Sequence, residues 1–231
     1  MNKKVLIIIP AYNEGEVLDG VIRNIKTELQ SLKDLNADVM VVNDGSSDNT
    51  KAVAEKSTTT ISHLVNMGSG AATRTGLEYA KRNNYDYAVT IDADGQHLAS
   101  DLTKVINKLV SENYDLVIGS RLLNTEGMPH HRVFGNKLLN LVTGIIFGVR
   151  VTDSQSGLKG FSRKAIEKID IRSNGFEFCS EIVWRAKQAN LKIIEVPIKA
   201  VYTDYSLAKG QSNINALRII KNLIMQKIRE V

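Results

Sequence analysis

The chain has little cysteine, and this shortage limits how it can be stabilised. Cys179 is the single cysteine among 231 residues, so no disulfide can form within the chain. It lies in a segment with helical spacing, where a buried structural thiol is commoner than a reactive one. We expect a reducing, cytoplasmic setting.

Long apolar runs are missing as well. The longest apolar stretch, Leu138 to Val149, is interrupted by Asn140 and Thr143 and falls short of the roughly 20 residues that a spanning helix needs. Near the start, Val5 to Ile9 is too short for a signal peptide. We therefore expect a chain that is neither exported nor inserted into a membrane.

The composition is that of an ordinary globular protein, with 43% hydrophobic and 24% charged residues. Residues 1–115 carry 12 Lys/Arg and 16 Asp/Glu, whereas residues 116–231 carry 18 and 9. An acidic half suits a cation site, and a basic half suits phosphate or an anionic membrane face. No repeat or linker is evident, so we expect a single domain, 1–231, whose two halves are built differently.

Apolar strand-like runs alternate with segments of helical spacing through the first half. This alternation predicts a right-handed, mainly parallel α/β sheet, in which ligands bind beyond the carboxyl ends of the strands. The expected strands are Val5–Ile9, Asp38–Val42, Thr60–Val65, Tyr87–Ile91 and Leu116–Gly119, and the helices lie near 18–32, 48–56, 70–82 and 102–110.

After residue 120 the regular alternation of predicted strands and helices ends. Helices are expected at 134–147, 178–189 and 214–228, and strands at 158–161 and 192–202. The last helix is basic and amphipathic, and one apolar stripe contains Ile214, Leu217, Ile220, Leu223, Ile224 and Ile228. Core packing or a dimer contact is the commoner role of such a stripe, and an interfacial helix on an anionic membrane is the alternative.

Polar clusters follow three of the predicted strands: Tyr12-Asn13-Glu14, Asn43 to Asp48, and Asp92 to His97. They are expected at one edge of the sheet, because parallel strands end together. Ser47 and Asp48 fit a functional role and a loop with a helix cap equally well.

Asp92-Ala93-Asp94 is the strongest chemical signal. In an extended backbone the two carboxylates lie on the same side, about 6 to 7 Å apart. They can then bind Mg²⁺ or Mn²⁺, which commonly keeps positions open for substrate phosphates. Gln96 is expected to complete the site, and His97 to lie behind it or at the surface.

Asn66 to Ala72 is Gly-rich and opens a helix. Its backbone amides, including that of Gly68, can bind an anion, or the small residues can serve close packing of helix on strand. It does not match the dinucleotide-binding fingerprint, because Thr73 stands where a third small residue is needed.

Together, several ordered motifs resemble family-2 glycosyltransferases, and more narrowly the dolichol- or polyprenyl-phosphate sugar synthases. The motifs are Ile9-Pro10-Ala11-Tyr12-Asn13-Glu14, Val42 to Asp48, Asp92 to His97, Gly119-Ser120-Arg121 and Asp153-Ser154-Gln155-Ser156-Gly157. The resemblance spans residues 5 to about 213. It implies a GT-A fold, a mainly parallel sheet with flanking helices, and inverting transfer from a nucleotide diphosphate sugar.

The resemblance also assigns roles to individual residues. Residues 1–115 become a nucleotide- and metal-binding half, and residues 116–231 an acceptor half. The implied roles are Pro10, Tyr12, Glu14 and Asp44 around the nucleoside, Asp92, Asp94 and Gln96 on the metal, Arg121 and Arg132 near phosphates, and Asp153 and Ser156 under the transferred sugar.

The chain departs from the family pattern in two places. Many members have Lys where this chain has Ser69, and an Arg-x-x-Gly-x-Ser-Lys segment where this chain has Ser206 to Asn213. Lys209 is then expected to supply a positive charge to the diphosphate.

The acceptor stays open between a lipid phosphate and a glycan hydroxyl, as in polysaccharide synthesis. A phosphate acceptor needs no general base, whereas a hydroxyl requires a carboxylate such as Asp153. A sugar-phosphate nucleotidyltransferase is less favoured, because its Gly-rich loop is replaced by Ala11 to Glu14. A non-catalytic nucleotide-sugar-binding partner of a membrane protein is the third alternative. We expect no nucleic-acid partner, and peripheral membrane association or a homodimer is compatible with the sequence.

Overall fold

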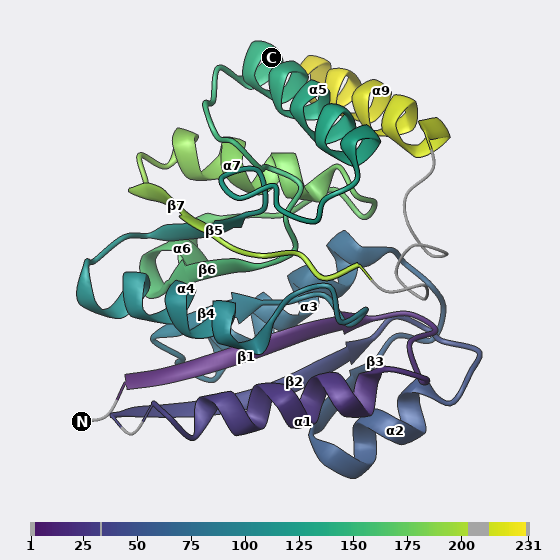
Figure 1. Cartoon of the computed structure of the whole chain (residues 1–231), viewed down its shortest axis with the longest axis vertical. Coiled ribbons are helices and arrows are strands. Elements are labelled where there is room, and N and C mark those ends of the chain that lie inside the picture. Colours follow the sequence, from purple (N-terminus) through teal and green to yellow (C-terminus); the bar gives the residue numbers. More distant parts are fainter. Residues whose placement is uncertain (1–2, 33, 203–212, 230–231) are drawn as a thin grey trace.

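The computed structural model describes residues 3–32, 34–202 and 213–229, and its centre is a seven-stranded sheet (Figure 1). Each predicted strand has a counterpart in this sheet. The strands are β1 (Lys3–Ala11), β2 (Leu35–Asn43), β3 (Thr59–Ser62), β4 (Tyr87–Thr90), β5 (Leu116–Ser120), β6 (Lys159–Ser162) and β7 (Ile193–Pro197).

Helices connect the strands, and a helix also follows the last strand. They are α1 (Leu18–Leu29), α2 (Thr50–Ser57), α3 (Ser69–Arg82), α4 (Ala99–Ser111), α5 (His130–Phe147), α6 (Arg163–Lys168), α7 (Phe178–Gln188) and α9 (Asn213–Arg229). The short helix α6 was not predicted, because six residues are too few to show a periodic pattern. None of the helices among the described residues has the length and apolarity required to span a bilayer.

The strand order is β3-β2-β1-β4-β6-β5-β7. All neighbouring strands are parallel except at β6, which is antiparallel to both β4 and β5. The mainly parallel sheet is therefore confirmed. Because β6 lies between β4 and β5, strands from both halves of the sequence belong to one sheet.

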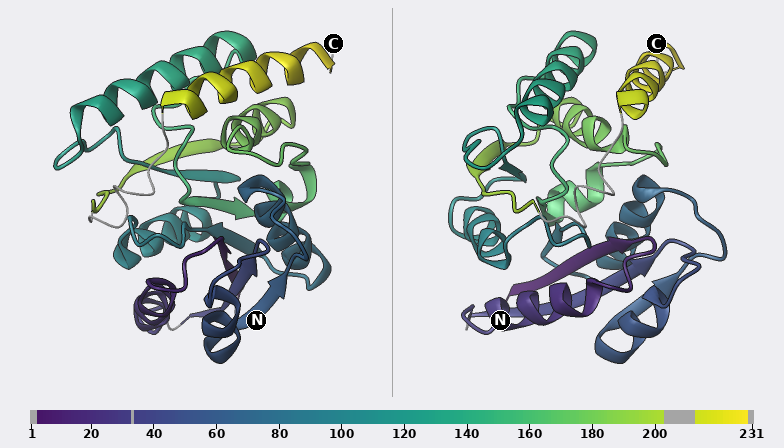
Figure 2. Two further views of the ribbon diagram at one scale, coloured as in Figure 1. Left: turned by 90° about the vertical axis from the view of Figure 1, so that its right-hand side faces the viewer. Right: turned by 45° about the vertical axis from the view of Figure 1, so that its right-hand side comes forward.

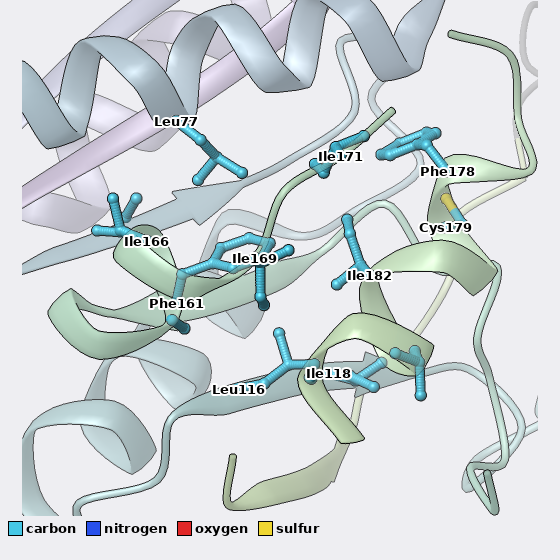
Figure 3. Packing of buried hydrophobic residues seen from close by; sticks show 14 of the residues in the cluster. Leu77, Leu116, Ile118, Phe161, Ile166, Ile169, Ile171, Phe178, Cys179 and Ile182 are labelled. Atoms are coloured by element: carbon cyan, nitrogen blue, oxygen red, sulfur yellow. The ribbon is translucent and has the colours of Figure 1, made fainter. Parts of the chain in front are cut away.

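Both faces of the sheet are buried, as the continuous apolar run of β1 predicts. Val5, Ile7 and Ile9 face a core completed by α1, α2 and α4. Leu6 and Ile8 point the other way, into a core completed by α3, α6 and α7, part of which Figure 3 shows. The result is a three-layer arrangement of helices, sheet and helices.

Small residues let α3 lie close to the sheet. A side chain at Gly76 would collide with Ile8 on β1, at 2.3 Å from its Cγ2 atom. In the same core, Cys179 is buried beside Phe178 (Figure 3), which confirms the expected structural thiol.

Helices α5 and α9 lie side by side at one end of the molecule, next to α7 (Figures 1 and 2). Trp184 on α7 joins them, because it stacks on Phe147 and Lys227 lies over its ring at 5.6 Å. On α9, Leu223 is buried whereas Ile224 and Ile228 are exposed. The predicted α9 stripe is therefore divided between core and surface.

Candidate active site

The carboxyl ends of β2, β1 and β4 share one edge of the sheet, because these neighbouring strands are parallel. The three polar clusters follow these strands. Their predicted convergence on a single edge is confirmed.

The first two clusters are joined by hydrogen bonds. The amide of Asn13 donates to Ser46 Oγ at 2.9 Å, and the amide of Ser47 donates to Asn13 Oδ1 at 2.9 Å. Asp48 accepts from the amides of Gly15 at 3.1 Å and Thr50 at 2.9 Å, at the start of α2. These contacts favour the loop and helix-cap alternative for Ser47 and Asp48.

Three of the residues predicted to contact the nucleoside lie at or just after the end of β1, next to these hydrogen bonds: Pro10, Tyr12 and Glu14. Pro10 is half-buried within β1, and the ring of Tyr12 is exposed. The amide of Glu14 donates to Thr50 Oγ1 at 2.8 Å. Their contact with a nucleoside remains a prediction.

Asp44 is buried, and its carboxylate has hydrogen-bond partners from the histidine side chain and the backbone of the chain after β3. Oδ1 lies 2.7 Å from His63 Nδ1 and accepts from the amide of Met67 at 2.9 Å, and Oδ2 accepts from the amide of Gly68 at 2.7 Å. On its other side, His63 Nε2 lies 2.9 Å from Thr75 Oγ1. Asp44 therefore fixes the loop after β3, and His63 is a partner that the sequence did not point to.

Gly68 lies where this loop enters α3, with a φ of +99° that favours glycine. A Cβ atom there would lie 2.3 Å from the carbonyl oxygen of Asn174. The same oxygen accepts from the amide of Gly70 at 2.8 Å. The amides of Met67, Gly68 and Gly70 are thus engaged within the protein, which favours the packing alternative for this Gly-rich segment.

After β4 the backbone turns earlier than expected. The strand ends at Thr90, and Ala93 and Asp94 form a turn. The expectation of an extended Asp92-Ala93-Asp94 segment is wrong, because this loop reverses at Gly95, whose φ is +74°.

The two carboxylates nevertheless influence each other. Burial and the charge of Asp92 raise the pKa of Asp94, although hydrogen bonds from Gln96 oppose the shift. Burial would also raise the pKa of Asp92, but His97, followed by Arg121 and Lys159, holds it below its ordinary value. A bound cation would offset the charge of Asp92 that raises the pKa of Asp94.

Two neighbours hold this pair in place. The Gln96 amide donates to Asp94 Oδ1 at 2.9 Å, and its side-chain nitrogen contacts Oδ2 at 2.5 Å. The buried ring of His97 places Nε2 3.2 Å from Asp92 Oδ2, so His97 lies behind the pair and not at the surface. In this arrangement Gln96 orients Asp94.

Gly157 makes room for Asp92. A Cβ atom at Gly157 would lie 2.1 Å from both carboxylate oxygens of Asp92. The Asp153–Gly157 motif therefore supports the carboxylate pair from the second half of the chain.

The donor set suits Mg²⁺ or Mn²⁺. Within residues 3–32, 34–202 and 213–229, no three His, Cys, Asp or Glu side chains are grouped so as to enclose a metal ion. Two oxygen donors that leave most positions open are typical of a cation that also binds substrate phosphates. The residues present therefore fit the expected group.

Arg121 and Asp153 form a buried ion pair. Arg121 Nε donates to Asp153 Oδ2 at 2.7 Å, Nη2 donates to Oδ1 at 2.9 Å, and the backbone amide donates to Oδ2 at 3.0 Å. Asp153 is fully buried. Although burial acts to raise it, the charge and hydrogen bonds of Arg121 hold the pKa of Asp153 below its ordinary value.

Arg132, at the start of α5, contacts Tyr202, and the charges of Arg121 and Asp153 also act on Tyr202. Its guanidinium carbon lies 5.2 Å from the centre of the Tyr202 ring. Burial raises the pKa of Tyr202, and the charges of Arg121, Arg132, Asp153 and Asp94 also act on it. Tyr202 was not predicted from the sequence, and Lys209 lies outside the described residues.

Lys159 is a second residue that was missed, since a lysine in a strand normally points to solvent. Here it is fully buried, and Nζ donates to the carbonyl oxygens of Ser154, at 3.0 Å, and Ser156. Its charge lowers the pKa of Asp153. Lys159 therefore stabilises the turn that carries Asp153.

The model of the family "Glycosyl transferase family 2" matches residues 6–170. The chain belongs to glycosyl transferase family 2. This confirms the resemblance, and the protein is a glycosyltransferase.

Two relatives of this family-2 enzyme match it along almost its whole length. A UDP-N-acetylglucosamine–dolichyl-phosphate N-acetylglucosaminyltransferase of Methanococcus voltae is 37% identical and covers 100% of this chain and 98% of its own. A polyprenol monophosphomannose synthase of Mycolicibacterium smegmatis is 30% identical, with 92% and 83% covered.

Among solved structures, glucosyl-3-phosphoglycerate synthase of Mycobacterium tuberculosis in complex with Mn²⁺ and UDP-glucose is similar to this family-2 enzyme. The TM-score is 0.73 at 18% identity, over 96% of this chain and 77% of that one. This likeness confirms the expected GT-A fold.

Proposed function

We propose that this glycosyltransferase moves a sugar, with inversion, from a nucleotide diphosphate sugar to the phosphate group of a polyprenyl or dolichyl lipid. The observation that carries the acceptor assignment is the state of Asp153. Both of its oxygens accept hydrogen bonds from Arg121, and its pKa is held low.

A carboxylate in that state is a poor general base. Efficient proton acceptance requires a pKa near the working pH and a lone pair directed at the acceptor. The pKa of Asp153 is held low and its side chain is fully buried, so it does not supply the base that a sugar or lipid hydroxyl would need. A phosphate oxygen is already anionic and attacks without losing a proton.

The donor end of the reaction is assigned to residues 1–115. The nucleoside lies at the sheet edge near Pro10, Tyr12, Glu14 and Asp44, with Gly68 shaping the adjoining loop. Asp92, Asp94 and Gln96 would hold Mg²⁺ or Mn²⁺, which supplies positive charge to the leaving nucleoside diphosphate when bound. The solved relative's complex with Mn²⁺ and UDP-glucose supports this choice of cation and donor class.

Residues 116–231 form the acceptor half of the same catalytic domain in this proposal. Arg121 is presented by Asp153 and Arg132 by Tyr202, and guanidinium groups match phosphate geometry. With Lys209 they would offset the charge on two phosphate-bearing ligands while the acceptor oxygen attacks the anomeric carbon opposite the leaving group. The relatives' names support a lipid phosphate as that acceptor.

The surface of α5 and α9 supports peripheral membrane association. Phe134, Leu138, Leu141 and Ile145 recur on one side of α5 and are exposed. Ile224, Met225 and Ile228 of the neighbouring helix α9 are also exposed, and residues 116–231 carry 18 Lys/Arg against 9 Asp/Glu. An apolar stripe with basic surroundings suits the interface of an anionic bilayer.

A transfer assay tests the proposal. Radiolabelled UDP-GlcNAc, UDP-glucose and GDP-mannose are each incubated with Mn²⁺ or Mg²⁺ and with polyprenyl phosphate in vesicles. We expect label in the organic extract, with one nucleoside diphosphate released per sugar transferred. Release of pyrophosphate, or sugar appearing only on glycan, would contradict it.

A further inference from the structure

The turn at residues 152–154 places Asp153 in the site, and besides Lys159 two further side chains from different elements hold it. Glu195 on β7 is the first. Its Oε1 accepts from the Thr152 amide at 2.8 Å, from Thr152 Oγ1 at 2.8 Å and from the Asp153 amide at 3.0 Å. Glu195 thus fixes the entry to the turn against the sheet.

Asn140 on α5 is the second. Its Oδ1 accepts from the Ser154 amide at 2.8 Å and from Ser154 Oγ at 2.7 Å, and its Nδ2 donates to the carbonyl oxygen of Thr152. These contacts lie on both sides of Asp153 along the backbone. Ser154 and Asp153 are fully buried, so leaving the Ser154 amide and hydroxyl without an acceptor is costly.

Helix α5 connects this turn to another part of the site. Arg132 lies in its first turn, where it stacks on Tyr202, and Asn140 lies two turns further along. Arg121 is held by Asp153 through three hydrogen bonds. A continuous chain of contacts therefore runs from Arg132 along α5 to Asn140, through the turn to Asp153 and on to Arg121.

We propose that Asn140 is a positioning residue for sugar transfer: it ties the Asp153 turn to α5 and thereby fixes Arg121 relative to Arg132. The inference rests on the proposed function, in which the two arginines act on phosphate groups in one site. A phosphate site built from two elements requires a fixed separation between its cations, since small displacements of reacting groups cost up to about 100-fold in rate.

Hydrogen exchange tests the structural step without any substrate. In Asn140→Ala the Ser154 amide loses its acceptor, so we expect its exchange to speed up by about tenfold or more. Asn83→Ala is the matched control, because Asn83 also donates to a backbone carbonyl, that of Tyr79 at 2.9 Å, at the far end of α3. Unchanged exchange in Asn140→Ala, or equal acceleration in both variants, would overturn the proposal.

Kinetics test the functional step. With UDP-GlcNAc, Mn²⁺ and polyprenyl phosphate vesicles as probes, we expect Asn140→Ala to lower kcat by about 10- to 100-fold. The KM for UDP-GlcNAc should change less than about twofold, because the nucleoside is bound by the other half. A change confined to this KM would count against positioning.

A double-mutant cycle separates positioning from a general loss of structure. If Asn140 acts by fixing Arg121 relative to Arg132, its removal should cost little once Arg132→Ala has been made. Full additivity of the two losses would contradict the proposal. If the unmutated enzyme turns over none of the nucleotide sugars, the proposed function itself fails, and the exchange result separately shows whether Asn140 holds the turn.

Discussion

The carboxylates after β4 and the carboxylate of Asp153 share a chemistry and differ in what neutralises them. Burial and the charge of Asp92 raise the pKa of Asp94, whereas His97, Arg121 and Lys159 lower the pKa of Asp92. Asp153 is paired with Arg121, and its pKa is lowered. In the proposed function the first region takes up an added cation, whereas Asp153 has its counter-charge within the protein.

Replacing a carboxylate of the first region should have the largest effect on activity. Asp92→Asn removes one of the proposed cation ligands, and we expect sugar transfer to fall by about a thousandfold. The fold should persist, because the change also relieves repulsion with Asp94. Transfer assays and thermal unfolding together check this, and near-normal metal-dependent transfer would separate Asp92 from the metal.

Replacing the carboxylate of the second region should lower stability in addition to transfer. Asp153→Asn leaves the Arg121 charge buried without a counter-charge, and we expect a loss of about 3–5 kcal/mol in the free energy of unfolding. Urea denaturation at neutral pH measures it. A loss below about 1 kcal/mol would show that the pair is not a buried structural unit.

The pH dependence of that loss has a defined sign. Because the folded-state pKa of Asp153 is depressed, its contribution is fully present above the unfolded pKa of about 3.9. It disappears as the pH falls through the lower, folded-state pKa. The stability difference between the wild type and Asp153→Asn should therefore be constant from about pH 8 to 5 and shrink below about pH 4.

Gly157→Ala probes the contact between the two regions. The added methyl group would occupy the space of the Asp92 carboxylate, with ideal Cβ positions only 2.1 Å from its oxygens. We expect transfer to fall by about 10- to 100-fold, and the concentration of Mn²⁺ needed for half-maximal activity to rise. Gly135→Ala, where nothing lies within 4 Å, is the control and should retain full activity.

The smallest effect is expected at the apolar surface. Ile145→Ser removes an exposed side chain from α5, and we expect binding to anionic vesicles to weaken by several-fold while nucleotide binding is unchanged. Vesicle flotation measures it. If the variant floats as well as the wild type, that stripe does not meet lipid.

Much of the fold was predictable because its signals are local. The apolar run of β1 predicts a strand buried on both faces, and Leu18, Ile22 and Ile25 predict α1 through their spacing. The orientation of β6 was not predictable, since four residues carry no direction.

The side-chain pairings within the site could not be predicted from the sequence. His63 is 19 residues from Asp44, and Asn140 is 14 residues from Ser154, so each pairing depends on how the chain folds back. Single polar residues give no periodic signal at such distances. The sequence therefore predicted which carboxylates matter, and the structure was needed to learn how each one is held.

In the proposed function the acceptor is a phosphate, which carries its own negative charge. The most direct test offers the enzyme, with its nucleotide sugar and Mn²⁺, a polyprenyl phosphate and the matching polyprenol in identical vesicles. We predict transfer to the phosphate and none to the alcohol. Transfer to polyprenol at a comparable rate would contradict the account, because it would require a base that Asp153 does not provide.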